Sequence, residues 1–243
     1  MPFAIEDKTI LVTGANRGLG RALVDEALSR GAARVYAAAR QPIVVRDARV
    51  SALVLDVTNP AQIQAAAAGV DALDLLINNA GISVADDLSQ RAALEEHLAV
   101  NLYGPLDVTT AFLPALTRRR GAVVNVISLA AVAAVPIMPA YSVSKAAALS
   151  VTQSLRARLA STGVSVHAVV PGPIDTDMVR DLDIPKTPAA EVARATLDGL
   201  QRGEEEIFPD AMSRSLADGW RAGVAKELER QNAALLRAWE QAA

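Results

Sequence analysis

Short apolar runs alternate along the chain with longer segments of helical spacing, and this alternation restricts the fold more than any other feature. Six such runs, rich in β-branched residues, begin near residues 9, 34, 51, 73, 122 and 164. Alanine- and leucine-rich segments with helical periodicity lie between most of them. Runs that are apolar almost throughout are typical of strands buried on both faces, and helical crossovers connect parallel strands. The sequence therefore predicts an α/β fold with a doubly wound parallel sheet.

The composition gives no sign of a boundary, so we expect residues 1–243 to form a single domain. No Gly/Ser linker, Pro-rich segment or internal repeat divides the chain. The hydrophobic content of 51% is sufficient for a substantial core. The N-terminal residues lack the features of a signal peptide, and charge, Gly or Pro interrupts every apolar run before about 18 residues. We therefore expect a cytoplasmic protein that does not bind membranes.

Charge and cysteine content argue against several classes of function. The chain has 24 basic and 27 acidic residues and no long run of like charges, which argues against a nucleic-acid surface. Cysteine is absent, so disulfides, thiolate metal sites and cysteine nucleophiles are excluded. The two histidines, His97 and His167, lack metal-site spacing, and we interpret both as structural. A small molecule is the expected partner, and no bound metal is expected.

The segment TGANRGLG, residues 13–20, follows the first apolar run directly and opens a helical segment. Its glycines, Gly14, Gly18 and Gly20, have no Cβ atom, so the backbone can turn tightly and approach a pyrophosphate. The N-terminus of the following helix presents free N–H groups to negative charge. Strand-to-helix turns also use glycine for steric reasons alone, but the order of strand, glycines and helix favours a nucleotide cradle.

Two polar segments end the third and fourth apolar runs. In LDVT, Asp56 and the backbone of Val57 lie where parallel sheets bind ligands and would hydrogen-bond an adenine ring. Alternatively, Asp56 forms an Asx turn or a helix cap before Pro60. In NNAG, residues 78–81, two adjacent asparagines either satisfy the backbone of a loop or line a cofactor cleft.

A tyrosine and a lysine four residues apart indicate a reactive pair. Tyr141 and Lys145 share one face of the helical segment that follows the fifth apolar run. A fixed ammonium near a phenol favours the phenolate, so Lys145 would lower the pKa of Tyr141. Ser128 ends the preceding run, where its hydroxyl would hold a carbonyl oxygen beside the tyrosine. On most helices such a pair is only a solvated face, and the nucleotide cradle upstream is what favours chemistry here.

These segments together resemble the short-chain dehydrogenase/reductase family. TGANRGLG, LDVT, NNAG, the Asn101 segment AVNLYG, Ser128, YSVSK and PGPIDT occur in the family's order and spacing over nearly the whole chain. The resemblance implies a Rossmann fold with a central sheet of about seven parallel strands and helices on both faces. It also implies hydride transfer between a nicotinamide cofactor and a carbonyl or alcohol.

The resemblance implies a role for each of four catalytic positions. Tyr141 would be the general acid in reduction and the general base in oxidation, and Ser128 would orient the substrate oxygen. Lys145 would lower the pKa of Tyr141 and bind the nicotinamide ribose. Asn101 would kink its helix and hold a water that connects Lys145 to solvent.

The implied cofactor contacts extend along the chain. In PGPIDT, the backbone of Ile174 and the hydroxyl of Thr176 would hold the nicotinamide carboxamide. The full expected set is Gly14, Asn16, Arg17, Gly18, Leu19, Gly20, Arg40, Asp56, Val57, Asn79, Ala80, Gly81, Tyr141, Lys145, Pro171, Gly172, Ile174 and Thr176.

The end of the second apolar run indicates which cofactor is used. NAD enzymes of this fold usually have an Asp or Glu there, whereas a 2′-phosphate needs cations. The chain instead has Ala39 followed by Arg40, and Arg17 lies inside the glycine loop. We expect both arginines to converge on a 2′-phosphate, as in the NADP-preferring members that the chain resembles; the alternative is that both are solvated surface residues. The predicted cofactor is NADP(H).

The sequence favours an NADP(H)-dependent oxidoreductase, a carbonyl reductase or alcohol dehydrogenase, over two alternatives. A non-catalytic NADP(H)-binding redox sensor would keep the cradle without needing the four catalytic positions. An isomerase or dehydratase would need chemistry that nothing in the sequence demands. The side chains expected around the reacting carbonyl favour an apolar aldehyde or ketone of modest size; they are Ile82, Leu129, Val135, Ile137, Met138, Met178 and Val179.

The resemblance also implies a homodimer or homotetramer. Family members usually pair through two helices, which here begin near Leu88 and Tyr141, and the alanine-rich segment SKAAALSVTQSL offers a small-residue surface for packing. A final helix is expected over residues 224–243. Its apolar side chains would dock on the body or on a second subunit, and they are Leu228, Leu235, Leu236 and Trp239.

Overall fold

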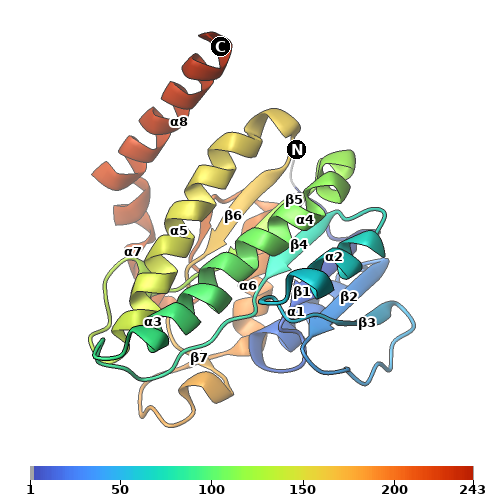
Figure 1. Ribbon diagram of the computed structural model, residues 1–243, viewed down its shortest axis with the longest axis horizontal. Coiled ribbons are helices and arrows are strands. Elements are labelled where there is room, and N and C mark those ends of the chain that lie inside the picture. Colours follow the sequence, from blue (N-terminus) through green and yellow to red (C-terminus); the bar gives the residue numbers. More distant parts are fainter. Residues whose placement is uncertain (1–2, 243) are drawn as a thin grey trace.

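The computed structural model describes residues 3–242 and places seven parallel strands in one central sheet (Figure 1). The strand order is β3-β2-β1-β4-β5-β6-β9, and each strand runs parallel to its neighbours. The strands are β1 (Thr9–Thr13), β2 (Arg34–Ala39), β3 (Val50–Val54), β4 (Leu75–Asn78), β5 (Ala122–Val126), β6 (Ser165–Val169) and β9 (Glu206–Ile207). A second, two-stranded sheet pairs β7 (Ile174–Asp175) with β8 (Thr187–Pro188). The predicted doubly wound parallel sheet is confirmed.

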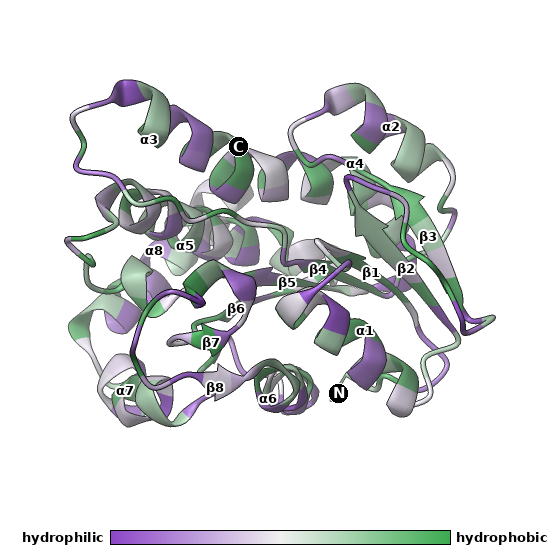
Figure 2. Ribbon diagram, turned by 90° about the horizontal axis from the view of Figure 1, so that it is seen from below, coloured by the Kyte–Doolittle hydropathy of each residue, from purple (hydrophilic) through white to green (hydrophobic). Residues whose placement is uncertain are grey.

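Helices cover both faces of the sheet, with α2 and α4 on one side and α1 and α6 on the other (Figure 2). The α-helices are α1 (Gly18–Ser29), α2 (Pro60–Ala68), α3 (Arg91–Leu98), α4 (Gly104–Arg119), α5 (Pro139–Leu159), α6 (Ala189–Gln201), α7 (Ala211–Arg221) and α8 (Val224–Ala242). A π-helical segment, η1 (Ala99–Tyr103), joins α3 to α4. The short 3-10 turns are η2 (Leu129–Ala131), η3 (Ala160–Thr162) and η4 (Asp177–Val179).

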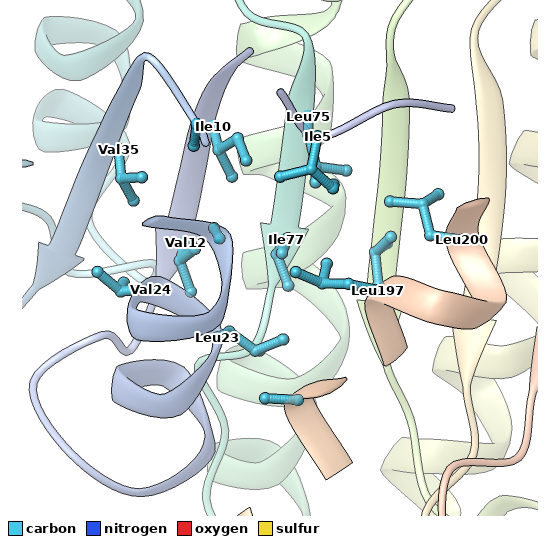
Figure 3. Close-up of a cluster of buried hydrophobic side chains, with 14 of the residues drawn as sticks. Ile5, Ile10, Val12, Leu23, Val24, Val35, Leu75, Ile77, Leu197 and Leu200 are labelled. Carbon is cyan, nitrogen blue, oxygen red and sulfur yellow. The ribbon is translucent and has the colours of Figure 1, made fainter. Parts of the chain in front are cut away.

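The apolar runs are continuous because each strand contributes to two cores. Successive side chains of a strand point to opposite faces, so Ile10 and Val12 of β1 join the core under α1 and α6, while Leu11 joins the core under α2 and α4. Figure 3 shows the first core, in which strand side chains meet Leu23 of α1 and Leu197 of α6.

The strands that follow β1 in the chain are added on one side of it, and the strands from β4 onward are added on the other side. The boundary between β1 and β4 is where this change occurs, and it positions the site. From β1 the chain continues to β2 and β3 on one side, whereas β4, β5 and β6 follow on the other. Ligands of such sheets bind at the carboxyl ends of the strands beside this boundary. The glycine loop follows β1 there, and NNAG begins at the end of β4.

The final helix, α8, is attached to the body by buried charge. The Lys226 ammonium contacts Glu205 at 2.7 Å, Glu206 at 2.9 Å and Glu229 at 2.9 Å, and Arg156 lies 2.8 Å from the Glu206 carboxylate. Beyond this cluster α8 projects from the body (Figure 1). Three of the four predicted apolar side chains are exposed rather than docked on the body, at 50% for Leu228, 67% for Leu235 and 69% for Trp239, whereas Leu236 is half-buried. Docking on a second subunit stays a prediction. The last residue of the predicted helix, 243, lies outside the described residues. Within residues 3–242, no helix combines the length and hydrophobicity needed to span a membrane.

Replacing Lys226 with methionine should weaken the folded protein. The Lys226 and Glu206 side chains are each only 2% exposed, and removing one partner of a buried ion pair costs about 3–5 kcal/mol. We expect Lys226→Met to lower the free energy of unfolding in urea by about 3 kcal/mol. Arg221→Met is the control, because Arg221 is half-exposed and lies no closer than 3.6 Å to Asp218 and 3.7 Å to Glu204, so its loss should cost less than about 1 kcal/mol. Equal losses in the two variants would contradict a structural role for the buried cluster.

Candidate active site

The threonine that ends β1 ties the glycine loop to the end of β4. Thr13 Oγ1 accepts hydrogen bonds from the backbone amides of Asn79 at 3.0 Å and Ala80 at 3.1 Å. The Asn79 side-chain amide donates to Thr13 O at 2.9 Å, so this asparagine satisfies loop backbone. Asn78 points into the core instead, where its amide donates to Thr109 at 2.9 Å and Asn125 at 2.8 Å. Asn79 therefore satisfies loop backbone while remaining only half-buried, and Asn78 is buried at 2% exposure. The contact of Asn79 with a cofactor stays a prediction.

The glycine loop leaves no room for side chains. Gly14 has φ +66°, and a Cβ there would lie 2.9 Å from Ala80 Cα. A Cβ on Gly20 would lie only 2.2 Å from Gly14 O. Helix α1 begins at Gly18, and its N-cap, Arg17, makes no side-chain capping bond, so the first amides of the helix remain directed at the loop. Free amides at a helix N-terminus fit the pyrophosphate of a dinucleotide.

Asp56 forms an Asx turn, and its predicted contact with adenine stays a prediction. Its carboxylate accepts from the Thr58 amide at 2.9 Å and the Thr58 hydroxyl at 2.8 Å. These bonds, the amide bond above all, hold the pKa of Asp56 below its usual value, with a smaller contribution from the charge of Arg40. Val57 is buried against Gly104, where a Cβ would lie 2.8 Å from Val57 Cγ2. The Asp56 side chain is thus engaged within its own loop.

The first two turns of α5 carry the predicted tyrosine and lysine. Tyr141 is partly buried, and desolvation raises the pKa of its phenol, while the neighbouring Ser128 hydroxyl acts in the opposite direction. Lys145 is 5% exposed, and burial lowers its pKa from 10.5 to about 8. The ammonium donates to Val126 O at 2.8 Å and lies 5.7 Å from the centre of the Tyr141 ring. The expected lowering of the Tyr141 pKa by Lys145 is not seen in this arrangement and stays a prediction.

Asn101 lies in the π-helical segment η1, so the helix is distorted where the resemblance implied a kink. Its amide group bonds both backbone atoms of Ile82, accepting from N at 2.9 Å and donating to O at 2.9 Å. It also donates to the Ser144 hydroxyl at 3.0 Å. Asn101 is therefore fixed between the segment after β4 and helix α5, and its role toward a water stays a prediction.

The segment PGPIDT lies across the glycine loop. A Cβ on Gly18 would lie 3.1 Å from Thr176 Cγ2, which brings Thr176 next to the start of α1. Pro171 O accepts from Leu129 N at 2.9 Å, so the segment also adjoins Ser128. Gly172 N donates to the buried Asp210 carboxylate at 2.8 Å.

Asp210, which supports this segment, was not among the predicted site residues. Asp210 also caps α7, where its carboxylate accepts from Ser213 N at 2.9 Å. The spacing of an Asp three residues before a Ser at a helix start was the available signal.

The two arginines predicted at the 2′-phosphate have different surroundings. Arg17 pairs with Asp177 at 2.9 Å, and Asp177 also contacts Arg180. Arg40 is exposed and lies near enough to Asp56 to affect its pKa. Arg17 is engaged with η4 in this structure, and the convergence of both arginines on a 2′-phosphate stays a prediction. Asp177 was not recognised in the sequence, since no local pattern links it to a residue 160 positions away.

Both histidines make structural hydrogen bonds. His97 donates from Nδ1 to Ala93 O at 2.7 Å and accepts from Val84 N at Nε2, at 3.1 Å. His167 bonds Glu204 O at 2.7 Å and Ser165 Oγ at 2.9 Å. Among residues 3–242, one group of carboxylates has metal-like spacing, Glu205, Glu206 and Glu229, and the Lys226 ammonium contacts all three.

Comparison with known proteins identifies similar chains. A family model described as short chain dehydrogenase matches residues 8–186. The 3-oxoacyl-[acyl-carrier-protein] reductase FabG of Salmonella typhimurium is 32% identical over 214 residues, which cover 82% of this chain and 87% of the relative. A crystal structure of a short chain dehydrogenase from Burkholderia cenocepacia in complex with NADP is 39% identical, with a TM-score of 0.86 over 93% of this chain and 98% of that one. A short-chain dehydrogenase from Streptomyces avermitilis is 26% identical, with a TM-score of 0.80 over 96% and 99% of the two chains.

Replacing Lys145 with methionine should stabilise the protein at neutral pH. The folded pKa of about 8 lies below the unfolded value of 10.5, so below pH 8 the folded state bears the full cost of a buried ammonium. We expect Lys145→Met to raise the free energy of unfolding at pH 7 by about 2–3 kcal/mol. The advantage should shrink as the pH rises from 8 to 10.5, because the folded wild type then releases the proton. Denaturation at pH 7 and pH 10 measures this. Lys186→Met is the control, because Lys186 is only half-buried and its ammonium donates to Arg180 O at 3.1 Å. An advantage independent of pH would contradict the explanation.

Proposed function

Since this chain belongs to the short-chain dehydrogenase/reductase family of oxidoreductases, we propose that it is an NADP(H)-dependent carbonyl reductase or alcohol dehydrogenase. The observation that carries the proposal is the convergence of four side chains beside the glycine loop. Ser128 and Tyr141 adjoin, Lys145 lies under the tyrosine ring, and Asn101 is joined to α5 through Ser144. A redox sensor without turnover would need only the loop, so this convergence favours catalysis.

The residues present fit the proposed cofactor. The uncapped N-terminus of α1 would bind the pyrophosphate, and the glycines would let the backbone approach it. Lys145 would bind the nicotinamide ribose, and the Ile174 backbone and Thr176 hydroxyl would bind the carboxamide. The 39% identical relative from Burkholderia cenocepacia was crystallised with NADP, which supports the choice of cofactor. When bound, the nicotinamide supplies or accepts the hydride.

The pKa shifts suit the protein side chains to proton transfer. Because burial holds the Tyr141 pKa above its usual value, the phenol is protonated at neutral pH and acts as the acid in reduction. Ser128 orients the carbonyl oxygen toward it. Lys145, whose pKa is about 8, takes up and releases a proton near neutral pH and so restores the proton of Tyr141. Asn101 holds α5 and the segment after β4 in place around this pair.

The proposed substrate is an apolar aldehyde or ketone. The segments flanking Ser128 and Thr176 present apolar side chains that are at least partly accessible, among them Ile137 at 62% and Met178 at 46% exposure. The names of two relatives, a 3-oxoacyl-[acyl-carrier-protein] reductase and a 3-amino-tetrahydro-pyrrolizinone reductase, describe enzymes that act on carbonyl compounds. The carbonyl group is the common element, and reduction is the proposed direction.

We also propose that the subunit is a single domain that forms a homodimer or homotetramer. Tyr103, just before α4, is 54% exposed, and Val143 of α5 is 44% exposed. Large apolar side chains on these neighbouring helices support pairing through them.

Replacing Tyr141 with phenylalanine should abolish turnover and leave cofactor binding intact. The ring remains, and only the transferable proton is lost. Proton transfer by a positioned side chain contributes roughly 100- to 10,000-fold to the rate. We expect kcat for ketone reduction to fall by about 1000-fold while the Kd for NADPH stays within about twofold. Tyr103→Phe removes a phenol from an exposed position and is the control. Turnover close to wild type in Tyr141→Phe would refute the acid–base assignment.

Arg40 should carry most of the preference for NADPH over NADH. A charged hydrogen bond to the 2′-phosphate contributes about 2 kcal/mol, so Arg40→Gln should raise the Kd for NADPH by roughly 30-fold and leave that for NADH nearly unchanged. Arg46→Gln removes the same charge from the same exposed loop and should change neither. Adding Ala39→Asp to Arg40→Gln should reverse the preference, because a carboxylate repels the phosphate and accepts from the ribose hydroxyls. Fluorescence titration at two salt concentrations measures these constants, and a wild-type Kd ratio near one would refute the assignment.

A further inference from the structure

The helix that carries Tyr141 is capped by a residue from another part of the chain. Helix α5 begins at Pro139, which has no N–H, and its N-cap residue, Met138, makes no side-chain capping bond. The first amide of the helix is therefore that of Ala140. It donates to the carboxylate of Asp86, at 3.3 Å from Oδ1 and 3.2 Å from Oδ2. The cap thus comes from 54 positions earlier in the sequence.

Asp86 lies in a strap, residues 82–88, that other polar groups hold in place. Both backbone atoms of Ile82 bond the Asn101 amide, and Val84 N donates to His97 Nε2 at 3.1 Å. Leu88 has φ +62°, a conformation that costs a leucine energy, and its N–H donates to Asp86 Oδ1 at 3.1 Å. These contacts fix the strap on both sides of Asp86, so its carboxylate is already positioned when it meets α5.

The same strap adjoins the reacting tyrosine by a second route. His97, which bonds Val84, is fully buried and forms a T-shaped pair with Tyr141, with ring centres 6.4 Å apart and planes at 73°. Ser83 lies 3.6 Å from the sulfur of Met138, the residue before α5. The strap and the start of α5 therefore pack as one unit.

We propose that Asp86 is a positioning residue for Tyr141, because its carboxylate caps the first amide of α5; this rests on the function proposed above. Tyr141 immediately follows the capped Ala140, so loosening of the first turn moves the phenol relative to Ser128 and the substrate carbonyl. Lys145 lies one turn further into the helix and is held by Val126 O, so it keeps its place. Displacing a reacting group by about 1 Å reduces rates by up to roughly 100-fold.

Three variants separate this role from a general effect on folding. Asp86→Ala removes the cap, whereas Asp86→Asn keeps an oxygen that accepts from the amide, and Asn caps helices about as well as Asp. Asp87→Ala is the matched control, because Asp87 is an exposed neighbour whose carboxylate accepts from Ser89 N at 2.9 Å within its own loop. The measurements are hydrogen exchange along α5, the Kd for NADPH and kcat.

In Asp86→Ala we expect the amides at residues 140–144 to exchange roughly fivefold faster than in wild type, with no change in the last turns of α5. The kcat should fall roughly tenfold while the Kd for NADPH stays within about twofold. Asp86→Asn should restore both exchange and kcat, and Asp87→Ala should match wild type. Unchanged exchange at the start of α5, or a loss of kcat that Asn does not restore, would overturn the proposal. The exchange experiment needs no substrate, so a failure of the cap is distinguishable from a failure of the proposed reaction, which would leave wild type without turnover.

Discussion

The bond network between β1 and β4 is the constraint on which the site depends. At the boundary between β1 and β4, the Thr13 hydroxyl accepts hydrogen bonds from two consecutive backbone amides after β4. Gly14 also packs against Ala80 and leaves no space for a Cβ. This fixes the glycine loop against NNAG, and NNAG in turn leads directly into the strap that bonds Asn101. A nucleotide cradle and a proton-transfer site are therefore held at a set separation by the sheet itself, because both begin at strand ends whose register is fixed.

Burial makes the proposed reactive pair effective and costs stability. Desolvation disfavours the charged forms of both side chains, so it keeps Tyr141 protonated and brings the Lys145 pKa down to about 8. Only Val126 O accepts from the ammonium in the described structure, and no carboxylate among residues 3–242 forms an ion pair with it. The contrast with Lys226 is instructive, since three carboxylates surround that buried lysine and its pKa is raised. A lysine paired in that way anchors a helix, whereas an unpaired one can exchange its proton near neutral pH.

Local sequence patterns predicted the fold and the order of the site segments, because strand periodicity and glycine turns are properties of neighbouring residues. The patterns did not reveal which side chains contact residues far along the chain. For Asp56 the sequence left open an adenine contact or an Asx turn; the hydrogen bonds to Thr58 form the turn, and the adenine contact stays a prediction. Asp86 and Asp177 bind partners 54 and 160 positions away, for which no spacing rule exists. The apolar side chains of α8 were expected to dock on the body or on a second subunit; the contacts of α8 with the body include buried ion pairs of Lys226, and docking on a second subunit stays a prediction.

The Arg17–Asp177 pair bears directly on the proposed cofactor preference. In this structure Arg17 neutralises a carboxylate of η4, so it contributes to a 2′-phosphate only by exchanging partners. Its side chain is 68% exposed and that of Asp177 is 40% exposed, and ion pairs so accessible to solvent contribute at most about 1 kcal/mol. Asp177 also retains Arg180 if Arg17 leaves. Because a phosphate carries more charge than a carboxylate and accepts more hydrogen bonds, the exchange favours the phosphate, but the energy of the lost pair is subtracted from the gain. Arg40 has no such competing acidic partner among the described ion pairs, and for this reason it, rather than Arg17, is the expected determinant of cofactor choice.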